Sequence, residues 1–243
     1  MLGLGLRIVP SVIAGDLLAL AASSRDDVPS AESATPTPPT PNPTVAPTTS
    51  DGPAGKPKSS ARKTTVPATG PGRYRPARVD VRAASGSGRL IRYDVKIEDN
   101  LDIDPDKAAR IVARVLNDER SWRGRERVRF ELVSADSGRA ELHAYIVTPG
   151  TTDRLCAPLL TQGEVSCQNG NRVVLNARRW QLGAAAYGQD LINYRRYLVN
   201  HEFGHYIGYG HVGCPGRGRR APVMMQQTKG LDGCKKNPWV ESD

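Results

Sequence analysis

The sequence predicts an α+β fold: a mixed, twisted sheet with one backing helix and one longer helix that carries the candidate site. Three observations predict it. Short apolar runs typical of strands recur between residues 90 and 176, and amphipathic helix patterns begin near 104 and near 190. Beyond residue 210 no long periodic pattern remains. We therefore expect an irregular C-terminal part held by disulfides.

The folded part is expected to span residues 73–243, because no aromatic residue occurs before Tyr74. Residues 25–72 are rich in Pro, Thr and Ser. Eleven of the nineteen prolines lie between 28 and 72, so this stretch cannot bury a core of its own. It is predicted to be a disordered linker.

Residues 1–24 are predicted to be a signal peptide or a membrane anchor. An apolar run from Ile8 to Ala22 follows Arg7, and Ala19-Leu20-Ala21 offers a small-x-small cleavage pattern. Asp16 interrupts the run, which is also short for a bilayer span of roughly 20 residues. Either outcome predicts a secreted or extracytoplasmic protein, free or anchored through its N-terminus.

The first strand and the first helix follow from simple patterns. Residues 90–97 alternate as a strand with one exposed face. Asp104 then suits a helix N-cap and Pro105 suits the first turn. One apolar stripe continues this helix through Ala108, Ala109, Ile111, Val112, Val115 and Leu116.

Two strands are predicted at 127–133 and 140–147, and Ser137-Gly138 between them predicts a hairpin turn. The region 148–171 reads as irregular, with a short edge strand expected at 163–167. A further short strand is predicted at 172–176.

Asp190 is predicted to cap the longer helix, whose apolar stripe includes Leu191, Tyr194 and Leu198. Before it, the segment around Trp180 reads as helical or looping. The stripe leads directly into the motif described next, so the helix face that packs the core is expected to present that motif.

The stretch from 201 to 211 reads H-E-x-x-H-x-x-G-x-x-H. His201 and His205 are four residues apart and share one helix face, with Glu202 beside them. Gly208 can end the helix in a left-handed conformation and bring His211 back as a third ligand. Three neutral imidazoles with an open fourth position predict a catalytic Zn²⁺ site.

The five-residue core of this pattern also arises by chance or in exposed helices, so the extension matters. The chain has only four histidines, and three of them fall at these spacings. The fourth, His143, lies in a strand-like run, where a surface or core role is expected.

Met224 and Met225 follow the motif closely and are the only methionines besides Met1. Two adjacent methionines are often simple core fillers. Their position shortly after a third histidine favours a tight turn that forms an apolar floor under the ligands.

Four cysteines lie in the folded part, and none forms a C-x-x-C pair, which argues against a thiolate zinc site. Of the three pairings possible, we favour Cys156 with Cys167 and Cys214 with Cys234, since each closes a local loop. Disulfides would indicate an oxidising compartment. The alternative is four buried thiols in a cytosolic protein.

The formal net charge is +9, and arginines gather at 120–129 and 217–220. No nucleic-acid-binding motif accompanies them, so we expect no nucleic-acid partner. Attraction to an anionic cell envelope or an acidic substrate is an alternative account. We favour a simpler one, in which alternating residues form the solvent face of a strand: Arg123, Arg125, Arg127 and Arg129.

The motif together with Val223-Met224 resembles the metzincin zinc metalloproteases, over roughly residues 190–227. Residues 198–202, 214–216 and 222–234 also resemble a family of actinobacterial exported proteins of unknown function, which is taken to be metzincin-like. These resemblances imply a zincin-like fold and a zinc ion. Some metzincins place a Tyr two residues after the Met, where this chain has Gln226.

We therefore hypothesise a monomeric zinc-dependent endopeptidase acting on protein or peptide substrates, with Glu202 as the general base. The alternative is a catalytically silent zincin-fold binding module at the cell envelope. Every sequence feature except Glu202 fits that alternative equally well.

Overall fold

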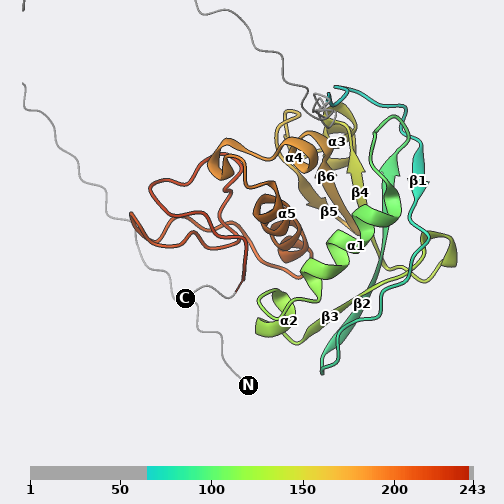
Figure 1. Cartoon of the computed structure of the whole chain (residues 1–243), viewed down its shortest axis with the longest axis horizontal. Coiled ribbons are helices and arrows are strands. Elements are labelled where there is room, and N and C mark those ends of the chain that lie inside the picture. The colour runs from blue at the N-terminus through green and yellow to red at the C-terminus, as the bar shows by residue number, and fades with distance from the viewer. Residues whose placement is uncertain (1–64, 241–243) are drawn as a thin grey trace, which may run out of the picture. The chain divides into compact units, whose positions relative to one another are not determined.

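A mixed sheet of six strands forms the centre of residues 65–240, the part of the chain that the computed structural model describes (Figure 1). Four strands run parallel, and β1 and β5 pair antiparallel with their neighbours. The strands are β1 (Tyr74–Pro76), β2 (Arg89–Glu98), β3 (Val128–Leu132), β4 (Leu142–Val147), β5 (Cys167–Asn169) and β6 (Arg172–Asn176). The predicted mixed α+β architecture is confirmed. The predicted signal peptide or anchor, and most of the predicted linker, lie outside the described residues.

Strand β2 is the central element, and its two faces differ. Its alternate residues Ile91, Tyr93, Val95 and Ile97 are fully buried in the main core, as strand periodicity requires. On the other face, Asp94 lies 2.9 Å from Nδ1 of His143 on β4. His143 thus has the structural role expected for it, far from the motif in sequence and on a different element.

The predicted hairpin between β3 and β4 is wrong. Both strands run parallel to β2 on opposite edges, and they meet it at one residue, Tyr93, which pairs with Leu132 and with Leu142. β3 pairs with the N-terminal half of β2 and β4 pairs with its C-terminal half. The segment that connects β3 to β4 therefore passes from one side of β2 to the other. Gly138 does turn the chain there, with φ of 66°.

Two helices pack against the same face of the sheet and enclose the main core (Figure 1). They are α1 (Pro105–Leu116) and α5 (Leu191–Tyr206). Each begins as predicted: Asp104 accepts a hydrogen bond from the Lys107 amide, and Asp190 accepts one from the Asn193 amide. The α1 face toward the sheet carries the predicted apolar stripe, of which only Ile111 is half-exposed.

Three shorter α-helices and two 3₁₀ helices complete the described fold: α2 (Trp122–Arg125), α3 (Pro149–Cys156), α4 (Ala177–Leu182), η1 (Ala135–Ser137) and η2 (Ala185–Tyr187). Helix α3 corrects the prediction that 148–171 is irregular, because Pro149 stands at the first helical position, where its fixed φ favours a helix. Helix α2 corrects the predicted arginine strand face, since Arg123 and Arg125 lie on it. The edge strand expected at 163–167 begins instead at 167.

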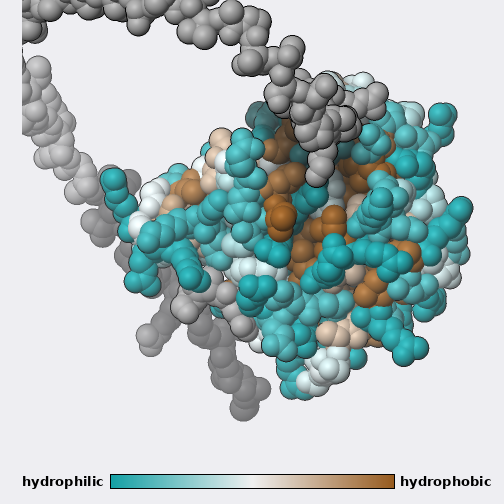
Figure 2. Space-filling view, in the orientation of Figure 1, coloured by the Kyte–Doolittle hydropathy of each residue, from teal (hydrophilic) through white to brown (hydrophobic). Residues whose placement is uncertain are grey.

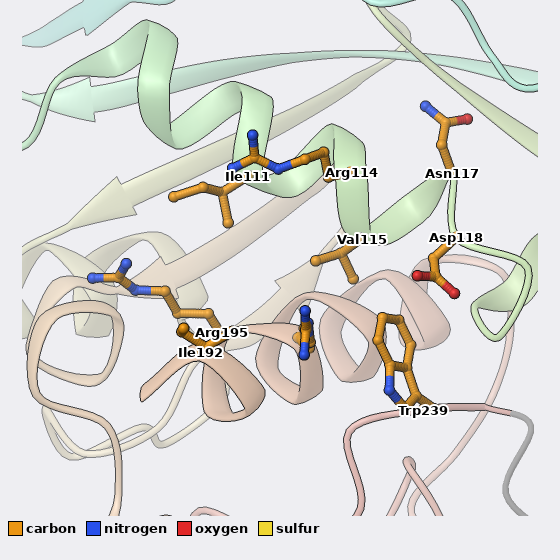
Figure 3. A pocket seen from close by; sticks show the side chains of 9 residues that line it. Ile111, Arg114, Val115, Asn117, Asp118, Ile192, Arg195 and Trp239 are labelled. Carbon is orange, nitrogen blue, oxygen red and sulfur yellow. The ribbon is translucent and has the colours of Figure 1, made fainter. Parts of the chain in front are cut away.

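A hollow of about 610 Å³ lies between α1 and α5, with Trp239 beside Val115 and Asp118 at one end and Ile192 and Arg195 at the other (Figure 3). Figure 2 shows apolar patches on this face within a mostly hydrophilic surface. The C-terminal segment, irregular as predicted, is held here by Trp239, whose ring lies under the guanidinium of Arg120 at 4.0 Å.

Residues 65–72, which were predicted to belong to the linker, form hydrogen bonds to α3 and to the turn after β2. The Ala68 carbonyl accepts a hydrogen bond from the Gly150 amide at 2.8 Å, and the Thr69 carbonyl accepts one from Asn100 at 3.0 Å. Ordered structure therefore begins before residue 73.

Glu98, at the end of β2, fixes this N-terminal segment to α3. The carboxylate is fully buried and accepts hydrogen bonds from Thr151 Oγ1 (2.6 Å), from the amide and hydroxyl of Thr148 (both 2.8 Å) and from the Gly72 amide (2.9 Å). Burial alone would raise the pKa of Glu98, but these donors outweigh it and hold the pKa below its ordinary value.

We predict that Glu98→Gln lowers the free energy of unfolding by about 1–3 kcal/mol at neutral pH, because buried donors lose a charged acceptor. A lowered folded-state pKa contributes stability above the unfolded pKa of about 4.3, and this is lost as pH falls through the folded value. Urea unfolding between about pH 7 and pH 3 should therefore show the two proteins converging in acid. A constant difference across that range would contradict the assignment.

Candidate metal centre

Three histidine side chains converge at the C-terminal end of α5. The Nε2 atoms of His201 and His211 lie 3.1 Å apart, those of His205 and His211 lie 3.1 Å apart, and those of His205 and His201 lie 3.2 Å apart. The structure thus brings together all three histidines singled out in the sequence. His201 is buried, His205 is partly buried, and His211 is exposed toward solvent.

The end of α5 is shaped to return His211 to the helix. The Tyr209 amide donates to the Gly204 carbonyl at 3.0 Å, and the Gly208 amide donates to the His205 carbonyl at 3.0 Å. This pair of hydrogen bonds is a Schellman motif, with Gly208 at the position that takes positive φ, here 104°. Gly208 therefore ends the helix as expected from the sequence.

Backbone carbonyls fix the orientation of two of the rings. His201 Nδ1 lies 2.9 Å from the Val223 carbonyl, and His205 Nδ1 lies 2.8 Å from the Tyr209 carbonyl. Since a carbonyl only accepts, each Nδ1 carries the proton and each Nε2 presents its lone pair inward. This is the outer support that metal-ligating histidines normally have.

The imidazoles are held in the neutral form. The pKa of His201 is lowered to about 3, mainly by burial. The hydrogen bond to the Val223 carbonyl acts in the opposite direction, and the neighbouring His205 and His211 add to the lowering. Burial is also the largest cause of the lowered pKa values of His205 and His211. At His211, the neighbouring His205 and the Lys229 ammonium lower the pKa as well. Neutral imidazole is the form that binds a metal.

The arrangement fits a tetrahedral zinc ion. Zn–N bonds of about 2.0–2.1 Å at tetrahedral angles place ligand nitrogens about 3.3–3.4 Å apart, close to the separations seen here. Two inward-facing lone pairs, on His201 and His205, stand 3.2 Å apart with no proton between them. That contact is unfavourable unless a cation lies between the rings.

Glu202 lies beside the histidines and is almost fully buried. Its Oε2 atom has no hydrogen-bond partner among the described residues, which is costly for a buried carboxyl oxygen. Burial raises the pKa of Glu202 to about 8. A divalent cation held by the histidines would favour the carboxylate form against this burial.

A tight turn closes the site from below. The Met225 amide donates to the Pro222 carbonyl at 3.0 Å, so Val223 and Met224 occupy the turn positions. Val223 supplies the carbonyl that orients His201, and Met224 is buried in the main core. The region expected to form the floor therefore lies against α5.

Buried polar side chains hold this turn in place. The Tyr197 hydroxyl donates to the Met225 carbonyl at 3.1 Å and accepts from the Gln227 amide at 2.9 Å. The Gln227 side chain, fully buried, accepts from Tyr187 and from the Asn237 amide. Floor and helix are thus connected by hydrogen bonds as well as by apolar packing.

Helix α2 supports the site from the other side, a role that the sequence analysis did not identify. Trp122 Nε1 donates to the Asn200 carbonyl at 2.7 Å, directly before His201. The Trp122 ring also packs on the Tyr209 ring at 4.4 Å, and the Tyr209 hydroxyl donates to Glu126. Tyr209 thus packs through its ring, and its backbone carbonyl orients His205.

Both predicted disulfides are confirmed. Cys156 pairs with Cys167, and Cys214 pairs with Cys234. The second links the segment after His211 to the segment after the turn, and it packs with Met225 in a small apolar cluster.

An open cleft of about 660 Å³ gives access to the histidines. Glu202, His205 and His211 line it, together with Gln226. Gln226 Nε2 lies 3.5 Å from His211 Nε2, so a side-chain amide lies beside the histidines. No sequence signal beyond its spacing from Met224 pointed to this contact.

Comparison with known proteins gives a family and no activity. Residues 62–240 match the family described as "Protein of unknown function (DUF3152)". No curated protein and no solved structure matches the chain. The chemistry of the site must therefore be argued from its residues.

The histidine cluster yields a direct binding prediction. His211→Ala should weaken zinc binding by more than the about 10–100-fold that loss of an outer supporting group costs, because a ligand itself is lost. Isothermal titration with zinc measures this. His143→Ala, which removes the histidine outside the cluster, should leave zinc affinity unchanged; equal effects of the two substitutions would contradict the assignment.

The packing under α5 yields a stability prediction. A Cβ on Gly204 would lie 2.5 Å from both Met224 Sδ and Trp122 Cζ2. Helix propensity favours Ala over Gly by about 1 kcal/mol, but overpacking costs about 1–3 kcal/mol and the buried Trp122 ring has little room to move. Gly204→Ala should therefore lower the denaturation midpoint.

The matched control is Gly213→Ala, since a Cβ there would have no neighbour within 4 Å. Its effect should stay within about 0.5 kcal/mol. A stabilised Gly204→Ala protein would show that the floor is not packed as described.

Proposed function

Since the chain belongs to the DUF3152 family, whose description names no activity, we propose from the site itself that it is a zinc-dependent endopeptidase. The observation that carries this proposal is the combination at the end of α5. Three Nε2 atoms lie 3.1–3.2 Å apart, and beside them a buried carboxyl oxygen has no hydrogen-bond partner within residues 65–240. This is the residue set for metal-assisted hydrolysis.

In the proposed enzyme, the Nε2 atoms of His201, His205 and His211 would hold a zinc ion beside the cleft. Bound zinc supplies a Lewis acid that polarises a peptide carbonyl and makes water acidic enough to act near neutral pH. The Val223 and Tyr209 carbonyls keep two of the rings in the ligating orientation.

Glu202 is the proposed general base. Its carboxylate takes the proton of the attacking water and then delivers that proton to the leaving amine. Oε2 is free to do this because no protein group occupies it among the described residues. A zinc ion with a purely structural role would have no use for a carboxylate in this position, which favours an enzyme over a silent binding module.

The compartment follows from the cysteines. Both disulfides are formed, which indicates an oxidising environment. No helix among residues 65–240 is long and apolar enough to cross a membrane. We propose that the protein acts outside the cytoplasm, where its substrates would be exported or envelope proteins.

We predict that Glu202→Gln retains one zinc per chain but lowers peptide hydrolysis by at least about 10²–10⁴-fold, because proton transfer is lost while the ligands remain. Metal content and cleavage of a mixed peptide library measure the two properties separately. A chelator should abolish cleavage by the parent protein and zinc should restore it.

Undiminished cleavage by the Glu202→Gln protein would contradict the mechanism. Zinc binding by the parent protein without cleavage of any library peptide would instead support the alternative, a zincin-fold binding module at the cell envelope.

A further inference from the structure

One wall of the cleft beside the histidines is apolar and unusually exposed. Leu159 and Leu160 are 52 % and 86 % exposed, and both line this cleft together with Val165. Single exposed apolar residues are common on protein surfaces and need no explanation. Here two neighbours line the same cleft as Glu202, His205 and His211.

The segment that carries these leucines is held in place. It leaves α3 and reaches β5, and the disulfide between Cys156 and Cys167 closes it. The Asp153 carboxylate accepts hydrogen bonds from Thr161 Oγ1 and from the Gly163 amide, the latter at 2.7 Å. The two leucines therefore lie on an anchored loop, so a ligand that binds there does not have to order the loop first.

Among the described residues, one lysine or arginine side chain lines the same cleft. Lys229 follows the turn under the histidines, and its amide donates to the Gln226 carbonyl at 3.1 Å. Within residues 65–240 its ammonium has no carboxylate partner. Of the residues that the structure describes, Glu202 alone brings a carboxylate to the cleft lining, and it is buried beside the histidines.

We propose that the cleft selects peptides carrying both an apolar side chain, bound against Leu159, Leu160 and Val165, and a carboxylate, bound by Lys229. This inference rests on the proposed peptidase function and names the substrate class of that site. Binding of the apolar side chain is favourable because it removes the exposed surface of the two leucines from water. The carboxylate is attracted because the Lys229 ammonium forms no ion pair with a carboxylate of residues 65–240.

The carboxylate has two sources in a peptide, an Asp or Glu side chain and the chain's own C-terminus. Their chemistry at an ammonium group is the same. Peptides with an amidated C-terminus retain only the first source, so paired free and amidated peptides distinguish an acidic-residue preference from a C-terminal one.

The test measures binding separately from cleavage. Zinc-loaded Glu202→Gln protein, in the full chain, is titrated with fluorescent peptides that differ at one position. The set contains Leu with Glu, Leu with Gln, and Ser with Glu. The Leu–Glu peptide should bind about 10-fold more tightly than either variant, the scale of one apolar group or one polar contact in a binding cleft.

Two substitutions assign the preference to its residues. Lys229→Gln should remove the advantage of Glu over Gln, and Leu160→Ser should remove the advantage of Leu over Ser, each without changing the other preference. Matched controls lie in the hollow between α1 and α5 (Figure 3), where Arg114→Gln and Ile192→Ser delete a cation and an exposed apolar side chain away from the cleft. The controls should leave both preferences intact.

Equal affinity for the three peptides, or preferences that survive both cleft substitutions, would overturn this inference. Cleavage by the parent protein with no such preference would do so while leaving the proposed peptidase intact. Selective, Lys229-dependent binding without cleavage by the parent protein would support the proposed ligand class and contradict the proposed peptidase function.

Discussion

The close approach of three neutral imidazoles is the constraint on which the rest of the site depends. Nε2 atoms 3.1–3.2 Å apart repel one another when their lone pairs face inward, so the fold must hold them there or a cation must draw them together. The fold holds two of the rings in place through the Val223 and Tyr209 carbonyls, which fix their orientations. Such preorganisation, with outer groups that set the tautomer, is typical of metal sites.

Distant parts of the chain contribute to this arrangement, and each contribution has an identifiable contact. The sheet and α1 bury one face of α5. Trp122 of α2 donates a hydrogen bond to the carbonyl of Asn200, the residue before His201. The tight turn at Val223 contacts His201, and a hydrogen bond from Tyr197 links this turn to α5. The second disulfide joins the segments on either side of that turn. The site is therefore a property of the whole described fold.

Sequence reasoning succeeded where the governing interaction is local. The caps of α1 and α5, the helix end at Gly208 and both disulfide pairings follow from neighbouring residues or short loops. It failed on the β3–β4 hairpin because strand pairing is non-local: the stagger of the two strands about Tyr93 leaves no local trace. The carbonyls that orient His201 and His205 were missed for a related reason, since every residue has a carbonyl and only the fold selects one.

The central claim is that the three histidines form one metal site with an open position. Crystals of the zinc-loaded protein, measured on both sides of the zinc absorption edge, test it most directly. The account predicts one anomalous peak about 2.0–2.1 Å from the Nε2 atoms of His201, His205 and His211, with no fourth protein ligand. A zinc peak elsewhere, or one bound by only two of these rings, would contradict it.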